Sequence, residues 1–344
     1  MKRRPTIIDV AKQAGVSKTT VSRVITGDGA NVREETVQRV QTAVDELGYT
    51  HNAVASSLRT ARTNIIMLSL PDITNPFWPA IARGVQDRME KEGYAVVFAN
   101  SDWDTEREMM FLEMARRNRF DAILINPVHV SNDELKATHI PTVLIGSHEG
   151  FPDFDIVGSD TYGATQLALT HLYDLGHRRI GLIRGRRESR PGHSRLRSYT
   201  DFLQEKQIPL DSSLIMRVPF DENGGRQALR QLLSLSQPPT AVLAANDILA
   251  IGALQAAHEA GLSVPAHLSI IGIDDIFAAS ATTPPLTTIA KPQYEIGKQA
   301  AEFLLDHLEK EPDLDLSKRP FSTPRRHLFK CTLQQRGSTA PPIN

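Results

Sequence analysis

From residue 64 onward, short apolar runs rich in valine and isoleucine alternate with amphipathic stretches of helical length. One series contains the runs NIIMLSL, YAVVFAN and DAILIN, with helices expected over 77–92 and 104–118. A second series contains RRIGLI, AVLAAN and LSIIGID, with helices expected over 195–206 and 247–260. Such runs are typical of parallel strands in sheets that helices cover on both faces. Because 344 residues exceed one ordinary core, the two series predict two α/β lobes.

The composition, 40% hydrophobic and 23% charged, is that of a globular chain. No stretch approaches the roughly 20 apolar residues that a membrane helix needs. No apolar run follows the basic N-terminal residues, as a signal peptide requires. The single cysteine, Cys331, cannot form an internal disulfide, and no residues have the spacing of a zinc site. We therefore expect a cytoplasmic protein with no cofactor, metal or membrane partner. The strands also lack a glycine-rich phosphate loop, which disfavours a nucleotide-binding Rossmann domain.

The first 63 residues have the opposite charge balance to the rest of the chain. They contain ten basic and six acidic residues, a balance of +4, whereas the remainder has 29 basic and 34 acidic residues, a balance of −5. A small basic region attached to a mildly acidic body indicates that a polyanion binds the basic region.

Two short helices joined by a glycine turn are predicted within this basic region. Apolar residues recur at helical spacing over 6–14, where Thr6 would cap the helix. Gly15 permits a sharp turn, and Ser17 would cap a second helix over about 18–25. A helix-turn-helix has this arrangement.

The second of these helices presents small or long polar side chains outward, which could reach base edges in the major groove of DNA. A third helix, Glu35 to Leu47, would pack behind the first two, and the alternative is a three-helix packing unit without DNA. The candidate DNA contacts here are Thr6, Ser17, Lys18, Thr19, Thr20, Ser22 and Arg23.

The segment YTHNAVASSLRT that follows has apolar residues at helical spacing but is too short to form a stable helix alone. It serves as a linker in either interpretation. The sharper hypothesis is a helix that forms on DNA, lies in the minor groove and inserts Leu58 between base steps. The candidate contacts are Asn52, Val54, Ala55, Leu58 and Arg59.

These segments resemble the lactose-repressor (LacI) family of bacterial transcription regulators. TIIDVAKQAGVSKTTVSRVITG is similar to the family's DNA-binding signature, VREETVQRVQTAVDELGY to its third helix and HNAVASSLRT to its hinge helix. Later segments match in order: DITNPFWPAIARGV, LGHRRIGLI, AANDILAIGAL, SIIGIDDI, PPLTTIAKP and RGSTAPP. The chain departs from the family pattern at Thr26, Arg33 and His51, where Asn, Ser and Pro are usual.

The resemblance implies a helix-turn-helix domain over 1–50, a hinge helix and linker over 51–63, and a two-lobed periplasmic-binding-protein-like domain over 64–340. The first lobe would comprise about 64–159 and 290–322, and the second about 160–289 and 323–340. It also implies a homodimer that binds a palindromic operator DNA, most often as a repressor, and a small sugar-type effector held between the lobes.

Effector contacts are expected beyond the carboxyl ends of the strands. Carboxylates there could accept hydrogen bonds from sugar hydroxyls, and rings could cover the sugar's C–H face; the alternative is helix capping and core packing. Arg195 matches the family's effector-binding arginine, with Arg197 as the fallback. We expect Asp247 to cap a helix and Asp275 to be structural. The candidates are Asp72, Phe77, Trp78, Asp102, Asp160, Arg195, Phe220, Asn246, Asp274 and Lys291.

Lys291 stands where the family often has glutamine. A second cation beside Arg195 suggests an anionic effector such as a sugar acid or sugar phosphate. An ion pair between Lys291 and an aspartate of the other lobe is the alternative, which we favour slightly.

The helix predicted over 77–92 is a candidate dimer face through Ile81, Val85 and Met89, although these residues could instead pack on the sheet.

Two other functions remain to be weighed. The body alone would suit a solute-binding protein of a transporter, but the basic head and the lack of a signal peptide disfavour it. An enzyme acting on a sugar is disfavoured because no nucleophile or metal partner is spaced to work with the candidate histidines. These are His148, His171, His177 and His193.

Overall fold

The computed structural model describes residues 5–25, 32–50, 62–185, 190–309 and 324–343, without the side chains of 190–193. It divides into two compact units, Met1–Thr63 and Asn64–Asn344. The predicted hinge contacts Asn52, Val54, Ala55, Leu58 and Arg59 lie outside the described residues, so the structure does not test them.

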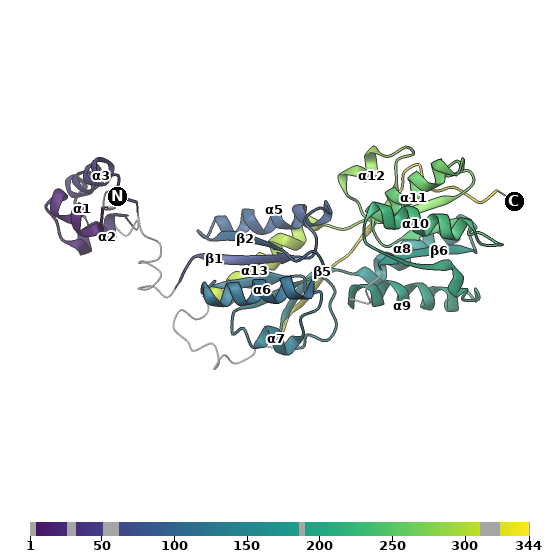
Figure 1. Cartoon of the computed structure of the whole chain (residues 1–344), viewed down its shortest axis with the longest axis horizontal. Helices are drawn as coiled ribbons and strands as arrows, with labels where there is room; N and C mark the ends of the chain where they lie inside the picture. Colours follow the sequence, from purple (N-terminus) through teal and green to yellow (C-terminus); the bar gives the residue numbers. More distant parts are fainter. Residues whose placement is uncertain (1–4, 26–31, 51–61, 186–189, 310–323, 344) are drawn as a thin grey trace. The chain divides into compact units, whose positions relative to one another are not determined.

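The first unit contains the three predicted helices: α1 (Ile7–Ala14), α2 (Lys18–Ile25) and α3 (Glu34–Leu47) (Figure 1). Thr6 precedes α1, and its backbone N–H and hydroxyl donate to the Asp9 carboxylate at 2.8 and 2.7 Å. Ser17 Oγ accepts from the Thr20 N–H at 3.1 Å at the start of α2. Gly15 ends α1 with a left-handed φ of 64°. The helices enclose a small apolar core made of Val10, Ala11, Ala14, Val21, Val40 and Ala43.

The second unit has two six-stranded sheets, which confirms the two α/β lobes. In the first lobe the strand order is β11-β5-β4-β3-β1-β2, and the pairs among the described strands are parallel. The strands are β1 (Ile65–Leu70), β2 (Ala95–Asn100), β3 (Ala122–Ile125), β4 (Thr142–Ile145), β5 (Asp155–Ser159) and β11 (Arg326–Phe329). The helices are α5 (Phe77–Glu90), α6 (Thr105–Arg117), α7 (Asn132–Lys136) and α13 (Gln293–Glu309).

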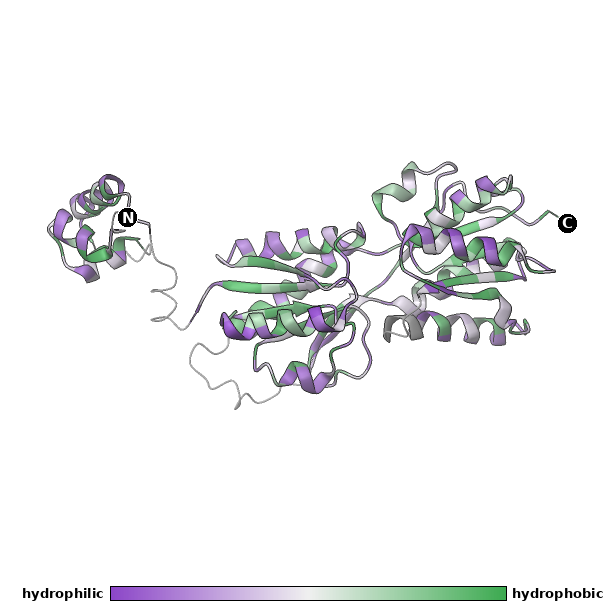
Figure 2. Cartoon of the chain, in the orientation of Figure 1, coloured by the Kyte–Doolittle hydropathy of each residue, from purple (hydrophilic) through white to green (hydrophobic). Residues whose placement is uncertain are grey.

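Side chains of each buried strand alternate between two apolar layers. On β1, Ile66 and Leu68 join the core formed with α5 and α13, while Met67 joins the core formed with α6 and α7. Figure 2 shows the resulting pattern, with hydrophobic strands between helices that are hydrophilic on their outer faces. The apolar runs of the sequence therefore arise because both faces of the sheet are covered.

The second lobe repeats this layout with the order β12-β10-β9-β8-β6-β7, in which only the β10–β12 pair is antiparallel among the described strands. Its strands are β6 (Ile180–Gly185), β7 (Ile215–Val218), β8 (Ala241–Ala244), β9 (Ser269–Asp274), β10 (Thr287–Ala290) and β12 (Thr332–Gln334). Its helices are α8 (Thr161–Asp174), α9 (Arg190–Glu205), α10 (Glu222–Leu233), α11 (Asp247–Glu259) and α12 (Phe277–Ala281).

The chain crosses between the lobes three times, and one predicted boundary is wrong. The crossings lie between β5 and α8, between β10 and α13, and between β11 and β12. The family resemblance predicts that residues from 323 onward belong to the second lobe. However, β11 pairs with β5 of the first lobe, with Arg326 beside Ile156, so the last crossing comes after Phe329. Strand pairing decides the boundary here, and the local sequence does not reveal the partner strand.

The three residues predicted to form a dimer face on α5 are not exposed for that role. Ile81, Val85 and Met89 are fully buried in the first lobe's own core, together with residues of α13. The alternative considered from the sequence, packing within the lobe, is the one observed.

None of the described helices is both long and apolar enough to span a bilayer.

Replacing Gly15 with alanine should destabilise the helix-turn-helix unit. A side chain at a φ of 64° costs about 1–2 kcal/mol, because Cβ approaches the following carbonyl oxygen. Amide hydrogen exchange of the full chain should therefore speed up at the core residues Val10, Val21 and Val40. Lys12→Ala, at an exposed site on α1, is the control and should leave this exchange nearly unchanged. Equal exchange in Gly15→Ala and Lys12→Ala would contradict the role given to the turn.

Candidate functional site

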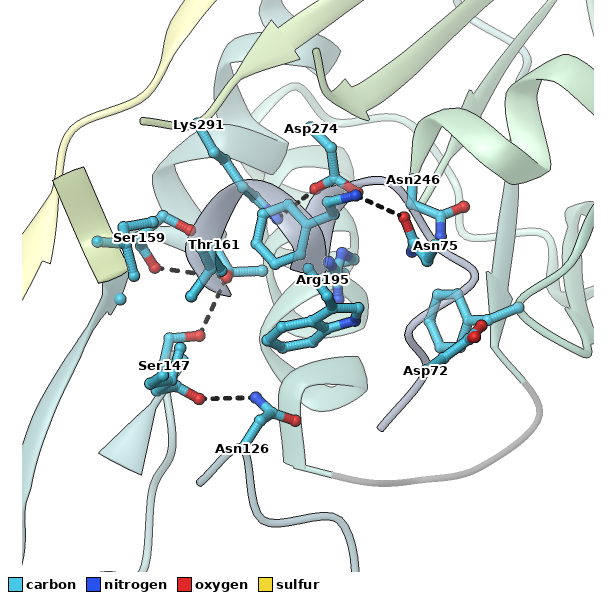
Figure 3. Close-up of a pocket in the computed structure, with 18 of the residues that line it drawn as sticks. Asp72, Asn75, Asn126, Ser147, Ser159, Thr161, Arg195, Asn246, Asp274 and Lys291 are labelled. Atoms are coloured by element: carbon cyan, nitrogen blue, oxygen red, sulfur yellow. Dashed lines mark hydrogen bonds and ion pairs between the residues drawn. The ribbon is translucent and has the colours of Figure 1, made fainter. Parts of the chain in front are cut away.

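A pocket lies between the lobes, beyond the carboxyl ends of their parallel strands (Figure 3). Its empty space, counted together with the open mouth, is about 790 Å3. The first lobe contributes Asp72, Asn75, Phe77, Trp78, Ile81, Trp103, Asn126, Ile145, Gly146, Ser147, Gly158, Ser159 and Ile296. The second contributes Thr161, Arg195, Phe220, Asn246, Asp274 and Lys291.

Eight of the ten residues predicted to contact an effector line this pocket, and two do not. Asp102 is exposed, accepts a hydrogen bond from Asn100 and forms an ion pair with Arg107. Asp160 caps α8 by accepting from the Gly163 N–H at 2.8 Å. Neither carboxylate lines the pocket; Asp102 is engaged by Arg107 of α6, and Asp160 by the N-terminus of α8.

The turn after β1 presents two polar side chains and two rings to the pocket. Asp72 Oδ1 accepts from the Thr74 N–H at 2.9 Å and from its hydroxyl at 2.6 Å, and Asn75 Oδ1 accepts from the Phe77 N–H at 3.0 Å. The Phe77 and Trp78 rings meet edge to face with centroids 4.9 Å apart. Asp72 therefore orders its own turn while it lines the pocket.

Asn246, not Asp247, caps α11. Asn246 Oδ1 accepts from the Leu249 N–H at 2.9 Å, and the side chain also lines the pocket. Asp247 is fully buried and accepts from the Thr288 hydroxyl at 2.5 Å and the Ile276 N–H at 2.9 Å. The prediction that Asp247 caps the helix is wrong by one residue, because the strand ends earlier than the run AVLAAN suggests. Burial, followed by the neighbouring Asp274, raises the pKa of Asp247 to about 7.

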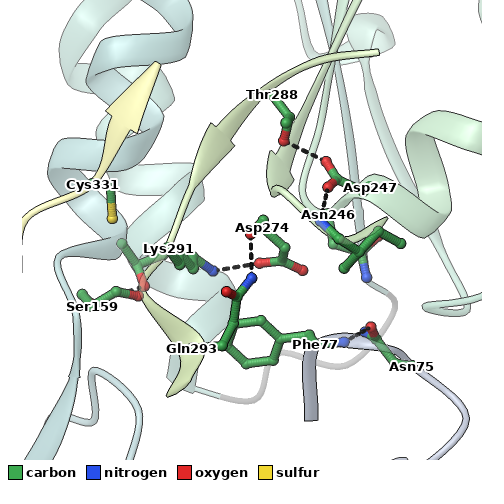
Figure 4. A network of polar contacts seen from close by, with 12 residues as sticks. Asn75, Phe77, Ser159, Asn246, Asp247, Asp274, Thr288, Lys291, Gln293 and Cys331 are labelled. Carbon is green, nitrogen blue, oxygen red and sulfur yellow. Dashed lines mark hydrogen bonds and ion pairs between the residues drawn. The ribbon is translucent and has the colours of Figure 1, made fainter. Parts of the chain in front are cut away.

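Lys291 and Asp274 form a buried ion pair (Figure 4). Lys291 Nζ lies 2.8 Å from Asp274 Oδ1, each side chain is 5% exposed, and Nζ is 5.1 Å from the centroid of the Phe77 ring. The two residues lie at the ends of neighbouring strands, β10 and β9. The favoured aspartate pair therefore forms, but within the second lobe rather than between lobes. It balances the charge of Lys291 inside the protein.

Arg195, on α9, is buried and lines the pocket, whereas the fallback Arg197 does not. Burial lowers the pKa of Arg195; Asp274 opposes this effect and Arg184 adds to it. Arg197 is exposed and lies 3.4 Å from Glu149. Asp275 does not line the pocket. Its Oδ1 lies 2.6 Å from a guanidinium nitrogen of Arg336, so it is structural, as predicted.

Six polar or aromatic residues of the pocket lining were not predicted from the sequence. The ends of β3, β4 and β5 place Asn126, Ser147 and Ser159 there, and Asn126 Nδ2 donates to the Ile145 carbonyl at 2.7 Å. The end of the run DAILIN could have identified Asn126 by the strand-end rule. Ser147 and Ser159 stand at the ends of β4 and β5, two strands that were not predicted, and Asn75 and Trp103 lie in turns. The six are Asn75, Trp103, Asn126, Ser147, Ser159 and Thr161.

The candidate histidines whose side chains are described, His148, His171 and His177, lie outside the lining of this pocket. His177 is buried and hydrogen-bonds to Thr240 Oγ1 at 2.9 Å and Ser269 Oγ at 3.1 Å; His171 bonds to Thr339 Oγ1 at 2.9 Å. His148 is buried, and the side chain of His193 is outside the described residues. Among the described residues no group of His, Cys, Asp and Glu could hold a metal ion.

The first unit presents the predicted polar surface on α2. Ser17, Lys18, Thr19 and Arg23 are exposed, while Thr6, Thr20 and Ser22 are partly exposed. Val21, on the opposite side of α2, is fully buried. The helix is therefore apolar only on its inner side and leaves its polar side chains accessible.

We expect the Asp247 carboxyl to make stability depend on pH between about 4 and 7. Its pKa is raised from 3.8 to about 7, so the folded chain holds this proton more tightly than the unfolded chain. Its contribution to stability is full below pH 4 and is lost as the pH rises through 7. Asp247→Asn, which never ionises, should gain stability relative to the wild type over this range in chemical denaturation.

Asp133→Asn, at an exposed carboxylate, is the control and should follow the wild-type pH profile. A constant difference between wild type and Asp247→Asn from pH 4 to pH 8 would rule out this role for Asp247.

Two protein-family models match the chain. The model "Bacterial regulatory proteins, lacI family" matches residues 6–52, and "Periplasmic binding protein-like domain" matches residues 169–339. The first confirms the helix-turn-helix as a DNA-binding domain of this family, and the second confirms the fold of the lobes.

Curated relatives and solved structures point to the same family as the family models. The transcriptional repressor CytR of Escherichia coli K12 is 35% identical over 340 residues, 97% of this chain and 96% of CytR. A ribose-bound LacI-family regulator from Enterococcus faecium is 32% identical with a TM-score of 0.69, covering 80% of this chain and 99% of that one. The Lac repressor dimer bound to operator and the anti-inducer ONPF is 26% identical with a TM-score of 0.85, covering 98% of this chain and 100% of that one.

These relatives regulate transcription, which agrees with the DNA-binding function predicted from the sequence and not with the solute-binding or enzyme alternatives. One match lies in the first unit of the chain and the other in the second. The chain therefore belongs to the LacI family of bacterial regulatory proteins.

Proposed function

We propose that this protein is a transcriptional repressor whose affinity for its operator is set by a small sugar-type effector bound between the lobes. The observation that carries the proposal is the pocket itself, which is lined from both lobes and belongs to a chain with a LacI-type DNA-binding domain. A ligand that contacts both lobes stabilises one arrangement of them over another.

The chemistry of the lining supports a sugar. Amides, hydroxyls and carboxylates can hydrogen-bond to sugar hydroxyls, while four aromatic rings offer apolar faces to its C–H groups. The similar regulator from Enterococcus faecium has ribose bound. Since Asp274 balances the charge of Lys291, the position of Lys291 does not require an anionic effector.

The proposal includes the route from the pocket to DNA. The chain acts as a cytoplasmic homodimer, as in the Lac repressor dimer, and two copies of α2 read the half-sites of a palindromic operator. Residues 51–63 form the hinge, in which Asn52, Val54, Ala55, Leu58 and Arg59 contact DNA. Coupling between hinge folding and DNA binding lets a shift of the lobes change operator affinity.

Binding to DNA fragments tests the regulator function directly. The full chain, mixed with fragments from upstream of its own and neighbouring genes, should retard one of them specifically. Binding should weaken steeply between about 50 and about 200 mM salt, as released counterions require. No retardation of any fragment at low salt would refute the proposal.

Leu58→Ala should weaken binding to the operator roughly tenfold or more, because an apolar wedge of this size loses most of its buried area. Binding to random DNA should change little. Leu58→Met, which keeps a similar apolar volume, is the control and should retain operator affinity. An equal loss on operator and random DNA in Leu58→Ala would contradict the wedge.

Arg195→Ala should abolish the response to the effector, because the buried guanidinium lines the pocket. Operator binding should persist, because Arg195 is not part of the DNA-binding domain, which the family model matches at residues 6–52. The probe is the compound that most stabilises the wild type in a thermal-shift screen of pentoses, hexoses, sugar acids and sugar phosphates. Arg197→Ala, at the exposed neighbouring position, is the matched control and should respond like the wild type. The reverse pattern would make Arg197 the anchor.

A further inference from the structure

Trp103 and Phe220 join the two lobes directly. Trp103 follows β2 in the first lobe and Phe220 follows β7 in the second, and both side chains line the pocket. Their rings are stacked with centroids 5.5 Å apart and an interplanar angle of 13°. Among the described residues this is the one ring-to-ring contact that links the lobes.

The backbone that carries Trp103 adopts an uncommon conformation. Asp102 and Trp103 have φ values of 50° and 59°, in the left-handed region that residues with a side chain rarely adopt. Such a conformation persists only where its surroundings hold it. Here the Trp103 N–H donates to the Pro71 carbonyl at 3.1 Å, and the Trp103 carbonyl lies 3.3 Å from His129 Nε2.

Further contacts fix the segments on either side of Trp103. Asp102 is paired with Arg107, and the Asp104 carboxylate accepts from the Arg107 N–H at 2.9 Å at the start of α6. Glu108, one turn further along α6, is buried and accepts from three successive N–H groups of residues 128–130 at 2.8–3.0 Å. This ties His129 to α6, so the turn that carries Trp103 is held from both sides.

The Phe220 ring packs against the backbone of Gly185, where any larger residue would place a side chain. A Cβ on Gly185, at the end of β6, would lie 2.0 Å from Phe220 Cε2 and 2.7 Å from Cζ. Gly185 has no left-handed φ, so alanine would suit its backbone and the clash would fall on the ring. The absence of a side chain at Gly185 therefore sets the position of Phe220.

We propose that the Trp103–Phe220 stack is the contact through which the two lobes close on the effector, and that the turn at 102–103 and Gly185 place its two rings. Trp103 is thus a positioning residue for effector binding. The inference rests on the proposed function. An aromatic pair shifts an equilibrium by roughly two- to twelvefold, which overlaps the lower end of the roughly 5- to 150-fold couplings typical between allosteric sites.

Lobe separation in the full chain tests this without DNA or a sugar. Cysteines introduced by Glu106→Cys on α6 and Gln204→Cys on α9, both exposed, carry a donor and an acceptor dye in a Cys331→Ser background. Labelled chains are mixed with excess unlabelled chain, so each dimer carries one labelled protomer. Single-molecule energy transfer then gives the populations of closed and open lobes.

Trp103→Ala and Phe220→Ala should lower the closed-to-open ratio two- to twelvefold. Gly185→Ala should lower it similarly, because it displaces the Phe220 ring and leaves both rings chemically intact. Trp103→Phe, which keeps a stacking face, should restore most of the closed population. The double variant Trp103→Ala/Gly185→Ala should open no further than Trp103→Ala alone, since the displaced ring has no partner left to lose.

Unchanged populations in Trp103→Ala and Gly185→Ala, or additive effects in the double variant, would overturn the inference. Thermal unfolding of each variant establishes that it is folded. These outcomes are separable from the proposed function: a chain that retards operator DNA and responds to a sugar, yet opens no more when Trp103 is replaced, refutes only the stack.

Discussion

Parallel strand pairing is the constraint on which the rest of the effector-binding unit depends. In a parallel sheet all carboxyl ends emerge at one edge, and here the two sheets present those edges to a shared pocket. Asn126, Ser159, Asn246 and Asp274 occupy comparable places on different strands although they are far apart in sequence. Their chemistry converges because both faces of each sheet are buried, which leaves the strand ends as the sites where polar side chains remain accessible.

The spacing of apolar residues along the sequence was sufficient to predict much of the fold and part of the site. Helical spacing and Gly15 predicted the three helices of the first unit, and the apolar runs predicted strands in both lobes. The same logic located Asp72 and Asp274 at the pocket, since each follows a run that ends clearly. Resemblance to the family added Arg195, Phe220 and Lys291, for which the residues alone gave no geometric reason.

Long-range pairing and side-chain competition limited the rest. The strand that pairs with β11 is β5, which lies about 170 residues earlier in the chain. The lobe boundary near residue 323 therefore could not be predicted from the local sequence. Asp102 and Asp160 have the residue type expected for sugar contacts, but Arg107 and the N-terminus of α8 engage their carboxylates. Trp103 was missed because its orientation depends on a left-handed turn, a conformation that tryptophan rarely adopts.

The three connections between the lobes are short. One residue separates β5 from α8, and two residues separate β10 from α13 and β11 from β12. With so little chain at each crossing, the lobes cannot slide apart by any appreciable distance, and a relative rotation at the three connections is the motion compatible with them. Any such rotation would displace the atoms of each lobe in proportion to their distance from these connections, so that the residues of a lobe farthest from them would move most.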